Sequence, residues 1–121
     1  MKESPVVAVI DDDESVREAL PPLLQELGYA AKAFSSAEEF LSSAWVDKIK
    51  CLILDIGMPR MSGPQLQREL VTRGRKIPIV FITAHESMRP RVLEQGAVEC
   101  LIKPFSDEAL LKALNTAFGR T

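Results

Sequence analysis

The feature that most constrains the fold is an alternation of five short apolar runs with segments of helical periodicity. The runs are bounded by polar or turn residues, and most are rich in β-branched side chains, as in strands buried on both faces. They are Val6–Ile10, the weaker edge candidate Tyr29–Phe34, Cys51–Leu54, Pro78–Thr83 and Glu99–Ile102. Strands that alternate with helices predict one α/β domain over residues 1–121, with a doubly wound parallel sheet of order 2-1-3-4-5.

The intervening segments carry apolar residues at helical spacing and begin or end at capping residues. They are Glu14–Leu27, Ser36–Ala44, Ser62–Gly74, Ser87–Gln95 and Ser106–Phe118. Two of them contain proline. Pro21-Pro22 predicts a kink or a break near Leu20, because proline lacks a backbone donor and clashes with the preceding turn. Pro90 limits the fourth helix to a start near Met88 or Arg89.

Polar side chains stand at the carboxyl ends of four of the predicted strands. They are Asp11 and Asp12, Asp55, Thr83, and Lys103. Because parallel strands end at the same edge of a sheet, the predicted order places Asp11, Asp12 and Asp55 around one crevice. Each residue alone also has a structural interpretation: Asp55 in an Asx turn, Thr83 as a strand-end cap, Lys103 as a partner for a carboxylate.

Three neighbouring carboxylates repel one another unless some are protonated or a cation neutralises them. Oxygen ligands without His or Cys favour a hard ion, Mg²⁺ before Ca²⁺. The alternative is a solvated acidic loop. An ammonium and a hydroxyl beside the ion and a free carboxylate suit the attack of Asp55 on a phosphoryl group.

The overall charge and the cysteines exclude several classes of function. The net charge is −2 with the signs interspersed, so we expect no direct contact with nucleic acid. No apolar run approaches the length of a membrane span and no signal-peptide pattern opens the chain, so a cytoplasmic location is the default. Cys51 and Cys100 lie in apolar runs of strands separated by one other, which predicts two reduced core residues.

The chain resembles the receiver domains of two-component response regulators, in particular the NarL/FixJ type. The matching segments are Val9–Glu14, Leu54-Asp55, Met58–Gly63, Ile82–Ala84, Gly96-Ala97 and Leu101–Phe105. The resemblance implies a phosphoacceptor at Asp55, a Mg²⁺ site and two phosphoryl-binding residues. In that scheme Mg²⁺ is held by Asp11, Asp12, Asp55 and the Gly57 carbonyl, Thr83 and Lys103 bind the phosphoryl group, and Pro104 is a candidate for a cis peptide bond.

The resemblance also implies partners. A sensor histidine kinase would donate the phosphoryl group, and the chain would catalyse only its own phosphorylation and dephosphorylation, so it is not an enzyme in the strict sense. The signal would leave through the face of the fourth helix, fifth strand and fifth helix. That face would control a partner, a second copy in a phosphorylation-dependent homodimer, or a C-terminal DNA-binding output domain outside this chain.

Three departures from the family pattern concern the output and the lifetime of the phosphoryl group. Cys100 replaces an aromatic residue whose ring often couples to the hydroxyl. The span from Thr83 to Lys103 is about two residues short, which predicts a shortened or displaced fourth helix. His85 and Gly57 occupy positions that tune hydrolysis, although His85 also fits an exposed loop residue.

Two other functions are compatible with the pattern. The first is a receiver-like interaction module that works without phosphorylation, which Cys100 and the short fourth segment favour. The second is an aspartyl-phosphate phosphatase acting on external substrates. Against the phosphatase, Asp55-Ile56-Gly57 has no second acid two residues after the nucleophile, and the chain has no insertion to cap a substrate.

Overall fold

The structure, a computed structural model, describes residues 4–119 and contains one five-stranded parallel sheet. The strands are β1 (Val6–Ile10), β2 (Ala30–Phe34), β3 (Cys51–Asp55), β4 (Ile79–Thr83) and β5 (Glu99–Ile102). Their order in the sheet is β2-β1-β3-β4-β5, and every neighbouring pair is parallel. The predicted topology is therefore confirmed, with β2 at an edge. The two ends of the predicted domain 1–121 lie outside the described residues.

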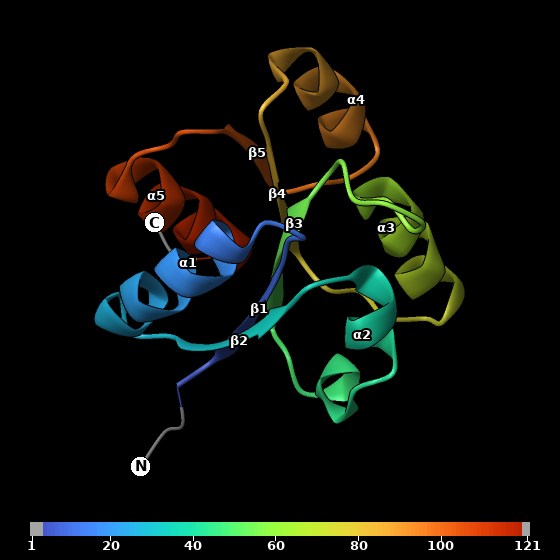
Figure 1. Cartoon of the computed structure of the whole chain (residues 1–121), viewed down its shortest axis with the longest axis horizontal. Helices are drawn as coiled ribbons and strands as arrows, with labels where there is room; N and C mark the ends of the chain where they lie inside the picture. The colour runs from blue at the N-terminus through green and yellow to red at the C-terminus, as the bar shows by residue number, and fades with distance from the viewer. Residues whose placement is uncertain (1–3, 120–121) are drawn as a thin grey trace.

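Helices cover both faces of the sheet. The two on one face are α1 (Glu14–Glu26) and α5 (Asp107–Ala117), and those on the other are α2 (Ala37–Leu41), α3 (Gly63–Thr72) and α4 (Arg89–Glu94) (Figure 1). Successive side chains of a strand point to opposite faces. Thus Cys51 and Ile53 pack in the cluster under α1 and α5, whereas Leu52 and Leu54 pack in the other cluster. The apolar runs of the sequence are buried because both faces of the sheet are covered.

Local capping interactions fix where several helices begin. Ser62 accepts a hydrogen bond from the N–H of Gln65, whose side chain accepts one from the N–H of Ser62, so this end is a complete capping box. Asp13 and Ser106 cap α1 and α5 in the same general way. Gly28 follows α1 with a φ of +96°, the left-handed conformation that ends a helix. These predicted boundaries are confirmed.

Of the predicted kink or break near Leu20, the break is wrong, because α1 runs without interruption from Glu14 to Glu26. The two prolines remove the N–H groups that would bond to the carbonyls of Arg17 and Glu18. Leu20 and Leu24, on either side of them, are both buried against the sheet. Packing of both halves of the helix therefore outweighs the loss of two hydrogen bonds.

The second helix is shorter than predicted, since α2 ends at Leu41 and a separate 3₁₀ turn, η1 (Ala44–Asp47), follows. Ser43 explains the interruption: its hydroxyl donates to the carbonyl of Phe40 at 2.7 Å and accepts from the N–H of Trp45 at 3.2 Å. Such local bonds compete with a continuous helix.

The fourth helix and the cysteines follow the predictions. A 3₁₀ turn, η2 (Glu86–Met88), precedes α4, which has 6 residues. The expected short helix beginning at Arg89 is therefore present. Cys51 and Cys100 are both buried and carry free thiols.

Candidate functional site

Three acidic residues meet at the carboxyl edge of the sheet. Asp55 is the last residue of β3 and Asp11 follows β1, and their exposed fractions are 8% and 0%. Asp12 is exposed, yet a carboxylate oxygen from each of the three lies within 4.8 Å of the others. The observed strand order thus brings Asp11, Asp12 and Asp55 together, as expected from the sequence.

Lys103, just beyond the end of β5, supplies the positive charge of this cluster. Its Nζ donates to Asp11 Oδ2 at 2.9 Å and lies 3.8 Å from Asp55 Oδ1. The other oxygen of Asp11 accepts from the N–H of Asp13 at 2.9 Å. The Lys103–Pro104 peptide bond is cis. Lys103 is therefore held between two of the three carboxylates.

Burial and the neighbouring charges shift the pKa values of Asp55 and Lys103. Burial, followed by the charge of Asp11, raises the pKa of Asp55 to about 6, and the ammonium of Lys103 only partly opposes this. Burial would lower the pKa of Lys103, but its hydrogen bond to Asp11 and the charges of Asp55 and Asp11 raise that pKa overall. One lysine does not neutralise the cluster, so the site has excess negative charge to offer a cation.

Thr83 ends β4 beside Asp55, and its side chain is nearly inaccessible, with 3% exposed. Asp55 pairs in register with Ile82, the residue before Thr83. The hydroxyl of Thr83 accepts a hydrogen bond from the N–H of His85 at 3.0 Å. A hydroxyl that accepts one bond still has its own proton to donate. Thr83 is therefore tied to the following loop through its hydroxyl, at the end of the strand next to β3.

Two predicted tuning residues lie in the loops that surround this cluster. His85 is exposed, and it contacts Thr83 through its main chain. Gly57 is also exposed, and a Cβ added there would have no atom within 4 Å. The space beside Gly57 is therefore open.

Gly63 contributes to the site in a way that the sequence analysis missed. A Cβ at this position would lie 2.5 Å from the main-chain oxygen of Asp55 and 2.8 Å from Cε1 of Phe81. The N–H of Gly63 donates to the carbonyl of Ile56 at 3.1 Å. The first turn of α3 thus packs directly on the backbone that carries Asp55. Two features of the sequence mark this glycine: it directly follows the capping Ser62, which is typical of a helix start, and it closes the Met58–Gly63 segment of the family pattern.

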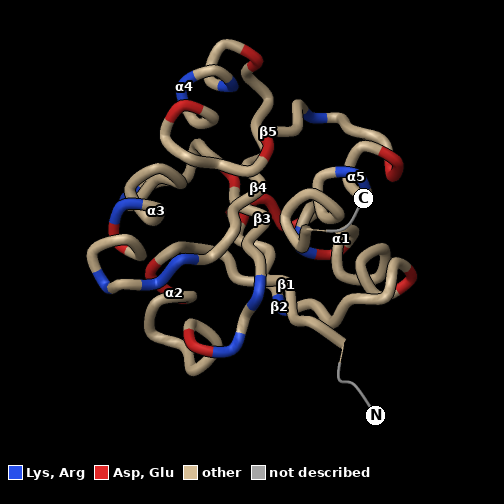
Figure 2. Tube along the Cα trace, turned by 180° about the vertical axis from the view of Figure 1, so that it is seen from behind, with Lys and Arg blue, Asp and Glu red and all other residues tan. Residues whose placement is uncertain are grey.

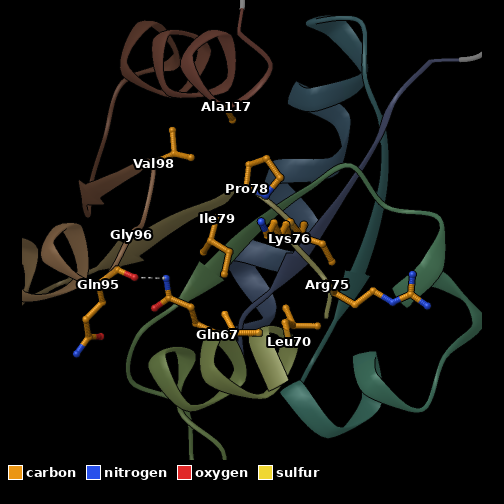
Figure 3. Close-up of a pocket in the computed structure, with 12 residues that line it drawn as sticks. Gln67, Leu70, Arg75, Lys76, Pro78, Ile79, Gln95, Gly96, Val98 and Ala117 are labelled. Carbon is orange, nitrogen blue, oxygen red and sulfur yellow. Dashed lines mark hydrogen bonds between the residues drawn. The ribbon is translucent and has the colours of Figure 1, made fainter. Parts of the chain in front are cut away.

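A cavity of about 340 Å³ lies at the opposite, amino edge of the sheet and is not part of this cluster. Its lining includes Ile79 at the start of β4 and Val98 just before β5, and the side-chain amide of Gln67 donates to the carbonyl of Gln95 across it (Figure 3). Lys and Arg stand on the segments that lead into β3 and β4 (Figure 2). The two edges of the sheet therefore differ in charge, with the acids gathered at the carboxyl edge.

A five-stranded doubly wound sheet of this order, with its polar cluster at the carboxyl edge, defines a flavodoxin-like receiver fold. The family model for the response regulator receiver domain matches residues 7–115. The chain therefore belongs to the receiver domains of response regulators, which are signalling proteins rather than classical enzymes.

Named relatives support the assignment. The chain is 43% identical over 114 residues to the response regulator protein TmoT of Ectopseudomonas mendocina, covering 93% of this chain and 52% of TmoT. It is 37% identical over 123 residues to the transcriptional regulatory protein FixJ of Azorhizobium caulinodans, covering 100% of this chain and 58% of FixJ. The chain thus spans about half the length of the curated relatives that it matches.

Solved structures show the same fold. The response regulator StyR superimposes with a TM-score of 0.87 at 44% identity, covering 97% of this chain and 60% of that one. The FixJ-N structure gives 0.85 at 34% identity, covering 100% and 98%. Within residues 4–119, no helix combines the length and apolar character that a membrane span requires.

Proposed function

We propose that this chain, as a single receiver domain over residues 1–121, is a cytoplasmic phosphoacceptor switch that accepts a phosphoryl group on Asp55 from a sensor histidine kinase. The observation that carries the proposal is the position of Asp55 at the carboxyl edge, with Lys103 3.8 Å away and oxygens of Asp11 and Asp12 within 4.8 Å. Such an arrangement combines a nucleophilic carboxylate with an ammonium that stabilises negative charge and with two further carboxylates that can bind a cation.

The residues present fit a bound Mg²⁺ ion. Three carboxylates supply hard oxygen ligands, and the pKa of Asp55, raised by burial and by Asp11, reflects the repulsion that a cation would relieve. Asp11, Asp12, Asp55 and the carbonyl of Gly57 would hold the ion. When bound, Mg²⁺ would neutralise charge on the transferring phosphoryl group.

Each residue of the site has its own role in the proposed phosphoryl transfer. A carboxylate oxygen of Asp55 attacks the phosphorus of the kinase phosphohistidine, an O–P bond forms, and the P–N bond breaks as the imidazole nitrogen leaves with the electron pair and takes up a proton. The ammonium of Lys103 binds one phosphoryl oxygen, and the hydroxyl of Thr83 donates its proton to another. Later attack of water on the phosphorus breaks the P–O bond to Asp55, so that phosphate is released and the carboxylate is regenerated, and His85 and Gly57 line the approach.

The proposed outcome is a change in the face formed by α4, β5 and α5. Thr83 moves toward the phosphoryl group, and the loop that begins at Ala84 follows it. FixJ is a transcriptional regulatory protein and is longer than this chain. We therefore propose transcriptional output through a DNA-binding domain that follows the receiver, with phosphorylation-dependent homodimerisation as the intermediate step.

Incubation with acetyl phosphate and Mg²⁺ tests the proposal. We expect a labile mass increase on the peptide that contains Asp55, absent without Mg²⁺ and absent in Asp55→Asn. Asp12→Asn is a second variant, because it removes an exposed proposed ligand and leaves the nucleophile intact. The absence of an adduct in the wild type would favour an interaction module that works without phosphorylation, and steady hydrolysis of unrelated phosphate esters would favour a phosphatase.

A further inference from the structure

The free side of β5 is covered by two side chains rather than by a strand. β5 lies at the edge of the sheet and pairs only with β4. The N–H of Cys100 donates to Glu99 Oε1 at 2.9 Å, and its carbonyl accepts from Arg89 Nε at 3.3 Å. Alternate residues of a strand turn their main-chain groups to opposite sides. The two side chains therefore take the hydrogen-bonding positions that a further strand would occupy.

Arg89 and Glu99 also bind each other, and we call this pair the edge clip. Arg89 Nη2 lies 2.9 Å from Glu99 Oε1. Because Arg89 is the first residue of α4, the edge clip fastens that helix to β5. The two side chains are 46% and 33% exposed, so the pair is worth far less than a buried ion pair and opens at low cost. Because it opens at low cost, this ion pair can be closed in one conformation of the protein and open in another.

A short series of hydrogen bonds connects the edge clip to the proposed phosphorylation site. Thr83 Oγ1 accepts from the N–H of His85 at 3.0 Å, and the carbonyl of His85 accepts from the N–H of Met88 at 3.1 Å. Arg89 is the next residue. The segment from Thr83 to Arg89 is therefore tied at both ends, to the site and to the edge of the sheet, and a shift of Thr83 is transmitted to the edge clip.

We propose that Arg89 is a positioning residue that couples phosphoryl binding at Asp55 to the free edge of β5. The edge clip is closed in the state described here. Movement of Thr83 toward a phosphoryl group draws His85 and η2 with it and withdraws Arg89 from the carbonyl of Cys100. The inference rests on the proposed function, since it assumes that Asp55 receives the group that moves Thr83.

Labelling of the two free thiols tests the coupling. Cys100 is 2% exposed beneath the contact between α4 and β5, and Cys51 is 0% exposed in the cluster on the other face. A thiol reagent, read by mass spectrometry of the separate peptides, reports opening at Cys100. Cys51 reports global unfolding in the same sample. The peptide with Asp55 shows whether the phosphoryl group has been added.

In the wild type, acetyl phosphate with Mg²⁺ should accelerate the labelling of Cys100 about tenfold, with Cys51 unchanged. Arg89→Ala should label Cys100 about fivefold faster before the phosphodonor is added, with little further response. Arg91→Ala is the matched control, an exposed arginine on the same helix, and should behave like the wild type. Glu99→Gln keeps an acceptor for the N–H of Cys100 and removes the charge, so its basal labelling rate at Cys100 should rise less than that of Arg89→Ala. If Arg89→Ala does not fold, Glu99→Gln is the variant that tests the coupling.

Two results overturn the coupling while the proposed function stands. One is a phosphoryl group on Asp55 with no change at Cys100, and the other is an Arg89→Ala chain with the wild-type basal rate and the wild-type response. A wild-type chain with no adduct on Asp55 overturns the proposed function and the coupling together. The Asp55 peptide distinguishes this case from the first two.

Discussion

Replacement of Gly63 by alanine is the sharpest structural test of how the site is held. The new methyl carbon would lie 2.5 Å from the main-chain oxygen of Asp55. Because such atoms normally stay about 3.4 Å apart, α3 and the end of β3 would have to separate by about 0.9 Å. The ring of Phe81, 2.8 Å from the same carbon, blocks escape in that direction.

The expected cost follows from three contributions. Overpacking costs about 1–3 kcal/mol, and weakening of the bond from the N–H of Gly63 to the Ile56 carbonyl adds about 1 kcal/mol. The smaller entropy of the unfolded alanine chain offsets about 0.4–1 kcal/mol. We therefore expect a net loss of about 1–3.6 kcal/mol, which lowers Tm by about 4–14 °C for a domain of this size.

Thermal melting followed by circular dichroism measures this loss. Gly57→Ala is the matched control, because its Cβ would have no atom within 4 Å and its Tm should stay close to that of the wild type. Displacement of Asp55 by this amount should also slow phosphorylation by acetyl phosphate about 100-fold. A Gly63→Ala chain that melts within about 2 °C of the control, a margin about half of the smallest predicted shift, would refute the reasoning.

Four other predictions concern the charges and α1. Burial and Asp11 raise the pKa of Asp55 from its ordinary 3.8 to about 6. Between these two pH values the folded chain retains a proton that the unfolded chain loses. Without Mg²⁺, urea unfolding should therefore show that the stability falls as the pH rises from 3.8 to about 6. For the same reason Asp55→Asn should melt higher than the wild type in EDTA at pH 7, and a lower Tm would contradict the predicted repulsion. Lys103→Met leaves the buried Asp11 without its cation, and we expect a loss of about 2–3 kcal/mol by urea denaturation, larger than that of the exposed Lys112→Met. Pro22→Ala restores a donor inside α1 and should stabilise the chain by about 1–2 kcal/mol; unchanged stability would mean that the Glu18 carbonyl has another partner.

Much of the fold could be predicted because the pattern of the sequence is strong and local. Apolar runs such as Val6–Ile10 and Cys51–Leu54 are typical of buried parallel strands, and capping residues mark the starts of the connecting helices. The positions of Asp11, Asp55, Thr83 and Lys103 then follow from the strand order, since parallel strands end at one edge.

The features that the sequence did not predict depend on contacts between distant residues. The continuity of α1 through Pro21-Pro22 results from packing of Leu20 and Leu24 on the sheet. Helix propensity, which depends on the local sequence alone, does not include such tertiary contacts. The role of Gly63 depends on its distance from Asp55 and Phe81. The edge clip joins Arg89 to Glu99 across the rest of α4 and the segment that leads into β5, and no motif specifies that geometry.

The contact between Lys103 and Asp11 joins residues 92 positions apart in the sequence, the ends of β5 and β1. During synthesis, a chain that has emerged only as far as β4 already has its three acids but still lacks the lysine that compensates them. The proposed phosphoryl transfer to Asp55 therefore requires the last strand to be in place. In kinetic terms, the proposed ability to receive a signal arises late in folding, because a copy truncated before β5 lacks the lysine that contacts Asp11.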